Sequence, residues 1–287
     1  MKKIGFIGVG VMGKSMVRNL MKQGLEVSIY TRSKDKVEDV ILDGAIWCET
    51  IAACSTKKDA VITIVGYPKD VEEVYFSEDG IINNATKGTY LIDMTTTSPK
   101  LSVKIYEKAK ERGLKALDAP VSGGDIGARN GSLSIMVGGE EEDFTACQDI
   151  FKAMGTTIVY EGKPGNGQHT KMANQIALAG AIAGVCEAMA YAKNAGLDIQ
   201  TMLDSISKGA AGSWQMTNMA PKMLQRDFAP GFFIKHMIKD LDIAVTEAES
   251  RELELGVLEQ VLSMYQRLEE EGKGELGTQA LCQYFEK

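Results

Sequence analysis

Residues 3–13 read KIGFIGVGVMG, and they indicate how the first half of the chain folds. Its apolar beginning predicts a buried strand over residues 3–9, and a helical pattern follows over residues 14–23. A G-x-G-x-x-G motif joins them, with glycines at positions 8, 10 and 13. In this context the first glycine permits a tight turn, the second lets the backbone approach a pyrophosphate, and the third lets the helix pack on the strand. The stretch therefore predicts a dinucleotide site, with a purely structural glycine turn as the alternative.

The end of the second strand bears on the choice of dinucleotide. This strand is predicted over residues 26–30, and Thr31-Arg32-Ser33 follows it, with Lys36 further along. An NAD site usually carries an acidic side chain here for the ribose 2′-hydroxyl. That carboxylate would repel a 2′-phosphate, whereas an arginine can hold the phosphate through two hydrogen bonds and stack on adenine. The segment predicts NADP, with NAD as the second option; the alternative is that Arg32 is a solvated surface side chain.

Strand and helix patterns alternate as far as about residue 161. Further strands are predicted over residues 60–65, 89–95, 115–121, 133–137 and 157–160, with helices between most of them. Such alternation is typical of an α/β fold with a Rossmann-type, doubly wound and largely parallel sheet covered by helices. Ligands of these sheets bind at the loops that follow the carboxyl ends of the strands.

Three of these loops carry residues suited to a ligand. Val65-Gly66-Tyr67 ends one strand. Thr95 and Thr96 follow the next strand, where the nicotinamide ribose would lie, although hydroxyls here can also cap a helix predicted over residues 100–112. Ser122-Gly123-Gly124 ends a third strand and offers a hydroxyl and exposed amides to a small carboxylate or hydroxyl substrate. The alternative for this last loop is an ordinary glycine-rich turn.

After Pro164 the strand patterns stop and only helical patterns remain. Helices are predicted over residues 167–195, 198–208, about 214–226, 232–251, 256–271 and 275–286. The change in composition over residues 162–167 marks a domain boundary. We therefore predict a dinucleotide-binding domain over residues 1–163 and an all-α domain over residues 164–287.

The first helix of the second half has an unusual composition. From Gly165 to Tyr191 it is almost entirely apolar, with Glu187 as the sole charged residue after Lys171, so it should be buried nearly all round. Lys171, Asn174 and Gln175 nevertheless share one face near its start, because they are three and four residues apart. Backbone amides and the helix dipole favour an anion at this end. The pattern indicates an acid and anion site, or else a lysine that extends to solvent between two polar neighbours.

The composition excludes several classes of protein. With 287 residues and a net charge of −7, the chain lacks the basic surface that nucleic acid requires. The amino terminus has no signal-peptide core, and there is no uninterrupted apolar run of about 18 residues, so no membrane partner is expected. Five scattered cysteines without a C-x-x-C pair fit a reducing cytoplasm. No cluster of His, Asp or Glu indicates a metal site.

Five motifs together resemble the β-hydroxyacid dehydrogenase family, which includes 3-hydroxyisobutyrate dehydrogenase, tartronate semialdehyde reductase and the glyoxylate/succinic semialdehyde reductases. The motifs are GFIGVGVMG, DMTTTSP, DAPVSGG, GNGQHTKMANQ and Ile238-Lys239-Asp240-Leu241, and they span essentially the whole chain in order. The resemblance implies that Ser122-Gly123-Gly124 contacts substrate and that Lys171 is the catalytic residue. It also implies that Lys239 lies near cofactor and substrate, with Asp240 beside it.

Two details relate the chain to groups within this family. Many members have Asn four residues after the lysine, whereas here Gln175 holds that position and Asn174 precedes it, as in the tartronate semialdehyde reductase group. The resemblance therefore leaves open which of the two amides contacts substrate. The Thr31-Arg32-Ser33 segment resembles the members that use NADP. The 6-phosphogluconate dehydrogenases share the fold, but this chain lacks their extended carboxyl-terminal region.

These observations predict an NADP-dependent oxidoreductase that moves a hydride between nicotinamide C4 and the carbinol carbon of a small 3-hydroxy acid, or its semialdehyde in reverse. Lys171 would be the general acid and base, because partial burial and the helix start favour a neutral amine over the ammonium of a free lysine, whose pKa is about 10.4. His169 is the leading rival for this role, and both His169 and His236 are expected to be structural or surface residues. An imine-reductase-like enzyme and a non-catalytic NADP-binding protein are the alternatives, although the imine-reducing relatives usually replace the lysine.

Residues 176–192 are too apolar for one small domain to cover, so a homodimer or homotetramer is expected. Trp214, Met216 and Phe232 are candidates to set the size of the substrate pocket. The substrate-binding candidates are Ser122, Gly123, Gly124, Asn174, Gln175 and Lys239. The cofactor-binding candidates are Gly8, Gly10, Val11, Met12, Gly13, Thr31, Arg32, Ser33, Lys36, Val65, Gly66, Tyr67, Thr95, Thr96, Phe232, Lys239 and Asp240.

Overall fold

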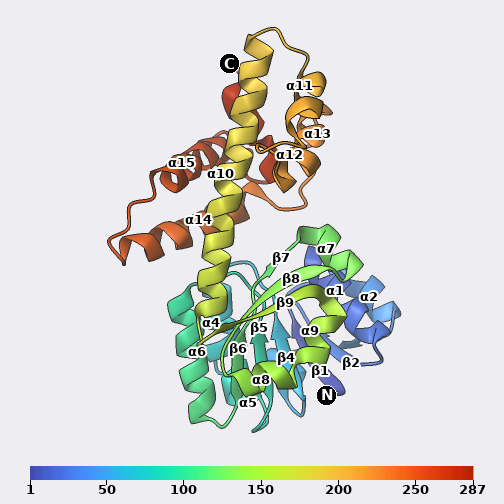
Figure 1. Cartoon of the computed structure of the whole chain (residues 1–287). Helices are drawn as coiled ribbons and strands as arrows, with labels where there is room; N and C mark the ends of the chain where they lie inside the picture. Colours follow the sequence, from blue (N-terminus) through green and yellow to red (C-terminus); the bar gives the residue numbers. More distant parts are fainter. Residues whose placement is uncertain (287) are drawn as a thin grey trace. The chain divides into compact units, whose positions relative to one another are not determined.

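The computed structural model describes residues 1–286, which divide into two compact units (Figure 1). The first unit, Met1–Lys171, contains the sheet and is called the sheet unit below. The second begins at Met172; its named elements as far as residue 286 are helices, and it is called the helical unit. One long helix, α10 (Asn166–Asn194), includes the point of division.

Within residues 1–286 the sheet has nine strands. They are β1 (Lys3–Ile7), β2 (Glu26–Tyr30), β3 (Ile46–Trp47), β4 (Ala60–Thr63), β5 (Tyr90–Asp93), β6 (Lys115–Asp118), β7 (Val121–Ser122), β8 (Leu133–Gly138) and β9 (Gly155–Gly162). Their order is β3-β2-β1-β4-β5-β6-β8-β7, and β9 pairs with β8. The strands from β3 to β6 are parallel, β8 is antiparallel to β6 and β7, and β9 is parallel to β8. The predicted Rossmann-type, largely parallel sheet is confirmed.

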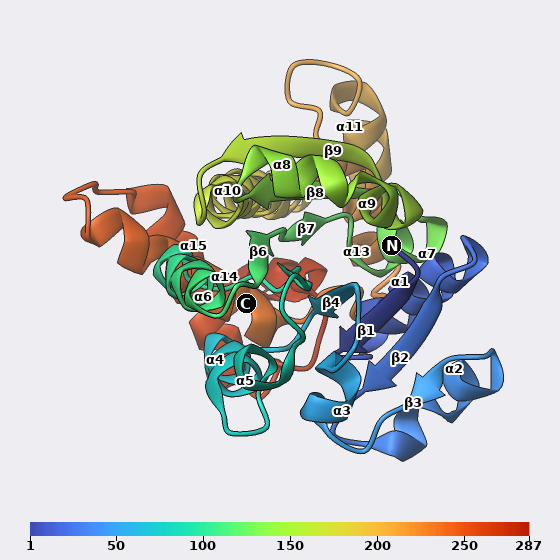
Figure 2. The same cartoon turned by 90° about the horizontal axis from the view of Figure 1, so that it is seen from below.

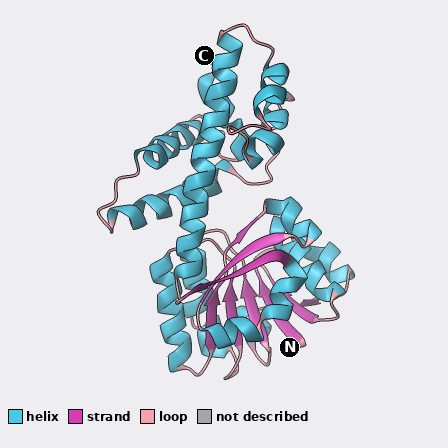
Figure 3. Ribbon diagram, in the orientation of Figure 1, coloured by secondary structure: helices cyan, strands magenta, loops and turns pink. Residues whose placement is uncertain are grey.

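The strand order reverses at β1, which lies between β2 and β4. Ile4 is paired with Val27 of β2 on one side and with Ala60 of β4 on the other. In open α/β sheets this switch point leaves a crevice outside the carboxyl ends of the strands, where ligands bind. The loops after β1, β2, β4 and β5 therefore open at one edge, toward which their arrowheads point in Figure 3.

Helices cover both faces of the sheet because successive strand side chains point to opposite sides. Phe6 of β1 packs in one core cluster with Met16 of α1 (Val11–Lys22), whereas Ile7 packs in a second cluster with Tyr75 of α4 (Pro68–Phe76). Figure 2 shows α1 and α3 on opposite sides of β1 and β2. The other helices of the sheet unit are the 3-10 helix η1 (Lys34–Val37), α2 (Glu38–Leu42), α3 (Ile51–Ser55), α5 (Ile81–Asn84), α6 (Pro99–Glu111), α7 (Gly124–Asn130), α8 (Glu141–Ala146) and α9 (Gln148–Met154).

The helical unit has its own apolar core, built around α10. Ile182 and Cys186 of α10 pack in one cluster with Leu241 and Tyr265. After α10 the unit contains α11 (Ile199–Ile206), α12 (Trp214–Asn218), α13 (Ala220–Leu224), α14 (Ile234–Glu249), α15 (Gly256–Glu270) and the 3-10 helix η2 (Thr278–Phe285). The predicted all-α second half is confirmed.

One side of α10 is exposed, so the expectation that this helix is buried nearly all round is wrong for the single chain. Ala177, Gly184 and Tyr191 are exposed, and 74% of Tyr191 is accessible. They are seven residues apart, so they form one stripe along the helix. In the part of the chain that the structure describes, α10 is the one helix long and apolar enough to cross a membrane. Its opposite side forms the core of the helical unit, which accounts for this composition.

Three local differences from the predicted elements have physical causes. The helix expected over about residues 214–226 is divided into α12 and α13, because Pro221 lies in the first turn of α13 and has no N–H to continue a helix. The strand expected over residues 115–121 is interrupted at Pro120, which cannot donate to the ladder. The segment expected as a helix over residues 275–286 is the 3-10 helix η2.

Candidate active site

The turn between β1 and α1 has the shape that a pyrophosphate requires. Gly8 has φ +99°, a conformation that side chains rarely adopt. A Cβ at Gly13 would lie 2.3 Å from the carbonyl oxygen of Gly8, so α1 packs directly on the turn. A Cβ at Gly10 would meet no atom within 4 Å, which leaves the backbone at the start of α1 open on that side. Backbone amides at an open helix start suit phosphate groups, so the turn fits a dinucleotide.

Arg32 lies just beyond β2 and is oriented by a carboxylate from α4. Its Nη2 donates to Asp70 Oδ1 at 3.0 Å, although 75% of the arginine side chain is exposed. Asp70 is buried, and its Oδ2 also accepts the N–H of Tyr67 at 3.0 Å. The guanidinium is thus directed by one hydrogen bond while most of its surface faces solvent. Of the neighbouring candidates, Thr31 and Ser33 are half-buried and Lys36 is exposed.

The loops after β4 and β5 are hydrogen-bonded to each other. The hydroxyl of Thr95 accepts the N–H of Val65 at 3.0 Å, and the N–H of Thr95 donates to Asp93 at 3.1 Å. Thr95 is buried, so its side chain joins the two loops at the sheet edge. Gly66, Tyr67 and Thr96 are half-buried, and they present the accessible surface of these loops.

Lys171 is buried in the sheet unit and reaches the loop that follows β6. Only 6% of the residue is exposed, and its Nζ donates to the carbonyl oxygen of Val121 at 2.9 Å. Ser122 is the next residue, and Gly123 and Gly124 follow with φ of +128° and +60°. A Cβ at Gly124 would meet no atom within 4 Å, so the backbone there is open to a small ligand. The start of α10 and the Ser122-Gly123-Gly124 loop, two of the predicted site segments, therefore meet here, and the side chain of Lys171 does not extend to solvent.

In the helical unit, four of the candidate polar side chains form a continuous set of contacts. Asp240 is 2% exposed; its Oδ2 accepts Gln175 Nε2 at 2.6 Å, and its Oδ1 pairs with Lys239 Nζ at 2.7 Å. Asn174 Nδ2 in turn donates to Gln175 Oε1 at 2.8 Å. Gln175 is buried and uses both ends of its amide within this set, whereas Asn174 is half-buried at the outer end.

The remaining candidates of the helical unit lie in different environments. Phe232 is half-buried and stacks on His236, with ring centroids 6.4 Å apart. Burial, with the nearby charges of Lys239 and Lys235, lowers the pKa of His236. Met216 is buried in the core, whereas 58% of Trp214 is exposed, so these two side chains do not share one environment. In the sheet unit His169 is half-buried on α10.

The sequence patterns give no role to Asp70, Asp118 or Gln168, although Asp118 begins the motif DAPVSGG and Gln168 lies in GNGQHTKMANQ. Each is a buried polar side chain that accepts hydrogen bonds from backbone N–H groups, and for Asp118 and Gln168 these donors are 47 to 71 residues away in the chain. Burial raises the pKa of Asp118, and the N–H groups of Gly165 and Gln168 oppose that rise. No local pattern encodes such distant contacts. The available signal was an acidic residue at a strand end, directly before a glycine-rich loop.

Family comparisons cover almost the whole chain. Residues 3–162 match the family model described as the NAD binding domain of 6-phosphogluconate dehydrogenase. Residues 165–285 match the model described as NAD-binding of NADP-dependent 3-hydroxyisobutyrate dehydrogenase. The chain belongs to the β-hydroxyacid dehydrogenase family. The family membership that the five sequence motifs indicate is confirmed.

Relatives of this β-hydroxyacid dehydrogenase support the assignment. It is 55% identical to an uncharacterized oxidoreductase of Bacillus subtilis (strain 168), over 100% of this chain and 99% of that one. It is 41% identical to the probable 3-hydroxyisobutyrate dehydrogenase-like 1, mitochondrial, of Arabidopsis thaliana, over 99% and 85% of the two chains. It is 36% identical to the 2-hydroxy-3-oxopropionate reductase of Escherichia coli (strain K12), over 99% and 97%.

Solved structures agree with this assignment. The 3-hydroxyisobutyrate dehydrogenase of Mycobacterium tuberculosis with L-serine superposes with a TM-score of 0.92 at 26% identity, and each chain is covered in full. Psf3 in complex with NADP+ and 2-OPP superposes with a TM-score of 0.89 at 25% identity over 99% of each chain. The protein is thus an NAD(P)-dependent β-hydroxyacid dehydrogenase, and the glycine turn after β1 fits that cofactor.

Proposed function

We propose that this β-hydroxyacid dehydrogenase uses NADP to interconvert a small 3-hydroxy acid and its semialdehyde, with Lys171 as the general acid and base. One observation carries the proposal: the amine of Lys171 is buried and lies 2.9 Å from the carbonyl oxygen of Val121, the residue before Ser122. A group that can transfer a proton is therefore next to a loop that can hold a small acid. The hydroxyl of Ser122 and the amides of Gly123 and Gly124 are the groups that would bind the substrate carboxylate.

The chain's own part in the reaction is proton transfer and orientation. The bound nicotinamide supplies or accepts the hydride. Loss of hydride from an alcohol makes its hydroxyl acidic, so a base at about 2.6–3.2 Å must accept the proton. The neutral amine of Lys171 accepts it and becomes an ammonium, and in the reverse direction the ammonium returns it to the carbonyl oxygen. Both forms carry N–H groups, so the hydrogen bond to Val121 is retained in each.

For the helical unit we propose that Asn174, and not Gln175, contacts the substrate. The amide of Gln175 is buried and bonded at both ends, to Asp240 and to Asn174. Asn174 is half-buried, and its amide is oriented by Gln175. The motif of the family assigns Lys239 to the cofactor and substrate, and the ion pair with Asp240 fixes the position of this lysine.

The preference for NADP is supported by the charge and exposure of Arg32. Its guanidinium keeps most of its surface free for a 2′-phosphate, and Asp70 directs it through a single hydrogen bond. The Thr31-Arg32-Ser33 segment has no acidic residue that would repel a phosphate.

We also propose that the protein is a homo-oligomer of the cytoplasm. The stripe of Ala177, Gly184 and Tyr191 exposes apolar surface on α10, and a second copy of the chain would cover it. All five cysteines are free thiols, which fits a reducing compartment. A monomeric mass by light scattering at micromolar concentration would contradict the first of these proposals.

The decisive experiment is a substrate panel read out by NADPH absorbance. It should contain the semialdehydes of small 3-hydroxy acids, 2-hydroxy-3-oxopropionate, 3-hydroxyisobutyrate, L-serine and a set of cyclic imines. Turnover of a hydroxy acid or semialdehyde by the native protein, lost in Lys171→Met, supports the proposal. Turnover of imines alone, or cofactor binding without turnover of any member, would contradict it.

A further inference from the structure

We propose that Asp118 and Gln168 are positioning residues, which fix the first turn of α10 on the sheet and thereby hold the Lys171 amine beside Val121. This inference rests on the proposed catalytic role of Lys171. All the contacts that carry it lie within the sheet unit, and they come from the ends of β5, β6 and β8.

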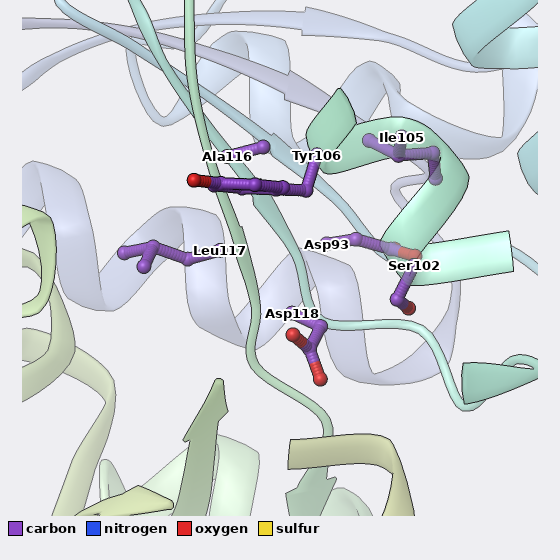
Figure 4. Close-up of a pocket in the computed structure, with 7 residues that line it drawn as sticks. All are labelled: Asp93, Ser102, Ile105, Tyr106, Ala116, Leu117 and Asp118. Carbon is purple, nitrogen blue, oxygen red and sulfur yellow. The ribbon is translucent and has the colours of Figure 1, made fainter. Parts of the chain in front are cut away.

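Asp118 caps α10 from a distance. It ends β6 and is 5% exposed; its Oδ1 accepts the N–H of Gly165 at 2.8 Å and its Oδ2 accepts the N–H of Gln168 at 3.0 Å. Amides at a helix start have no partner within the helix, and the helix dipole favours a negative charge there. The local sequence supplies a glycine before Asn166, so the capping group comes from a strand 47 to 50 residues earlier. Figure 4 shows this carboxyl group at the end of β6.

The backbones around this cap are too close for side chains. A Cβ at Gly167 would lie 2.4 Å from the carbonyl oxygen of Met136 and 2.7 Å from that of Asp118. A Cβ at Gly138 would lie 2.6 Å from Asp118 Oδ1. The helix start therefore rests directly on β6 and β8, with no room to shift toward them.

Gln168 fixes the rotation of the same turn. It is fully buried; its Nε2 donates to the carbonyl oxygen of Thr95 at 2.7 Å and its Oε1 accepts the N–H of Thr97 at 3.1 Å. Both ends of the amide are thus held by the loop after β5. Lys171 is three residues further on the same face of α10, so the turn that carries the lysine cannot rotate without breaking these bonds.

The test compares Gln168→Met and Asp118→Asn with the native enzyme. Met keeps the length of the side chain but removes both hydrogen bonds, and Asn turns an NH2 group toward one of the two backbone N–H groups that Asp118 caps. Because a displacement of about 1 Å can cost a factor of about 10² in rate, we expect kcat to fall by roughly that factor in both variants, with NADPH affinity unchanged in Asp118→Asn. A second readout needs no substrate: an amine-reactive reagent should label Lys171 several-fold faster in both variants, as measured by peptide mass spectrometry.

Asp59→Asn is the matched control. Asp59 also accepts two backbone N–H groups, of Lys2 at 2.6 Å and of Lys3 at 3.0 Å, but at the start of β1. It should lower the unfolding temperature without changing kcat or the labelling of Lys171. If the test variants lose only stability, as this control does, and keep native kcat and labelling at 25 °C, the inference is wrong. If instead Lys171→Met keeps native turnover, the proposed function fails, while the labelling rate still decides whether the two residues position the lysine.

Discussion

Asp93 of the sheet unit and Asp240 of the helical unit are both 2% exposed, yet their environments differ. Asp93 Oδ1 accepts the hydroxyl of Thr63 at 2.8 Å and a backbone N–H at 3.1 Å. Its Oδ2 adjoins a small cavity between β5, β6 and α6, and among the described residues it has no hydrogen-bond partner (Figure 4). Asp240 pairs with Lys239 at 2.7 Å and accepts the amide of Gln175 at 2.6 Å. Burial raises the pKa of Asp93 to about 6.

The difference reflects how each unit fixes its polar positions. In the sheet unit the strand ends and glycine turns are set by backbone hydrogen bonds, so a carboxyl group there needs no cation to determine the local structure. In the part of the helical unit that the structure describes there is no strand ladder, and one helix is fixed relative to another through side-chain pairs such as Gln175 of α10 with Asp240 of α14. Removing the charge of Asp93 should therefore stabilise the sheet unit, whereas removing the charge of Asp240 should destabilise the helical unit.

The largest effect is expected at Lys171, because its buried amine should contribute to the reaction and not to the stability of the fold. Lys171→Met retains the apolar stem but removes the proton donor and acceptor, so turnover should fall by roughly 10² to 10⁴ while NADPH affinity and unfolding temperature are kept. Lys171→Arg should also be inactive, because a guanidinium does not give up its proton near neutral pH. Steady-state rates at saturating NADPH measure this, and near-native turnover in the Met variant would transfer the role to His169 or to solvent.

Asp240→Asn should show the cost of breaking a buried pair in the helical unit. The side chain of Lys239 is 11% exposed, so loss of the Asp240 carboxylate deprives a nearly buried ammonium group of this ion pair. The free energy of unfolding should fall by about 3 kcal/mol, measured by urea denaturation at pH 7. The double variant Lys239→Met/Asp240→Asn should recover part of this loss. An equal or larger loss in the double variant would show that packing, and not the unpaired charge, is responsible.

Arg32 and Asp70 form an exposed counterpart of the buried pair. Because 75% of the arginine side chain is accessible, the pair should contribute little to stability, and the arginine is available for a ligand. Arg32→Ala should weaken NADP binding by about 2 kcal/mol, the scale of a charged hydrogen bond, and leave NAD binding nearly unchanged. Fluorescence titration with both cofactors measures this. Equal weakening of both, or a native preference for NAD, would refute the assignment.

The sheet unit could be predicted from sequence in greater detail than the helical unit, because local backbone structure fixes the first and side-chain contacts between distant residues fix the second. The glycine turn after β1 and the strand periodicity depend on neighbours in sequence, so the Rossmann-type fold and the turn at Gly8 could be predicted from the sequence. The two-residue strand β3 was not, since it is too short to show a period. The contacts of Gln175 with Asp240 span 65 residues, and those of Asp118 with the start of α10 span 47 to 50. Such contacts depend on packing, which no local pattern encodes.

The smallest expected effect is a gain in stability from Asp93→Asn, and its dependence on pH identifies the cause. Because the pKa of Asp93 in the folded protein is about 6, above the usual value of 3.8, the folded state keeps a proton that the unfolded chain releases. This contribution to stability is complete below about pH 4 and is lost as the pH rises through about 6. The asparagine keeps the oxygen that accepts from Thr63 and has no charge to bury. The variant should therefore match the native protein at pH 4 and exceed it at pH 7.5.

The expected gain at pH 7.5 is about 1 kcal/mol. Raising the pKa of Asp93 from 3.8 to about 6 corresponds to about 3 kcal/mol, but the new NH2 group also requires a partner in the cavity beside Ser102, which offsets part of it. Thermal unfolding from pH 4 to 8 measures the difference. Asp59→Asn is the control of opposite sign: hydrogen bonds from the N–H groups of Lys2 and Lys3 lower the pKa of Asp59, so its stabilisation is present at pH 7 and lost as the pH falls below the usual value of 3.8. A gain for Asp93→Asn that is equal at every pH would show that shape and not charge is responsible, and a loss at pH 7.5 would mean that the carboxylate is paired in solution.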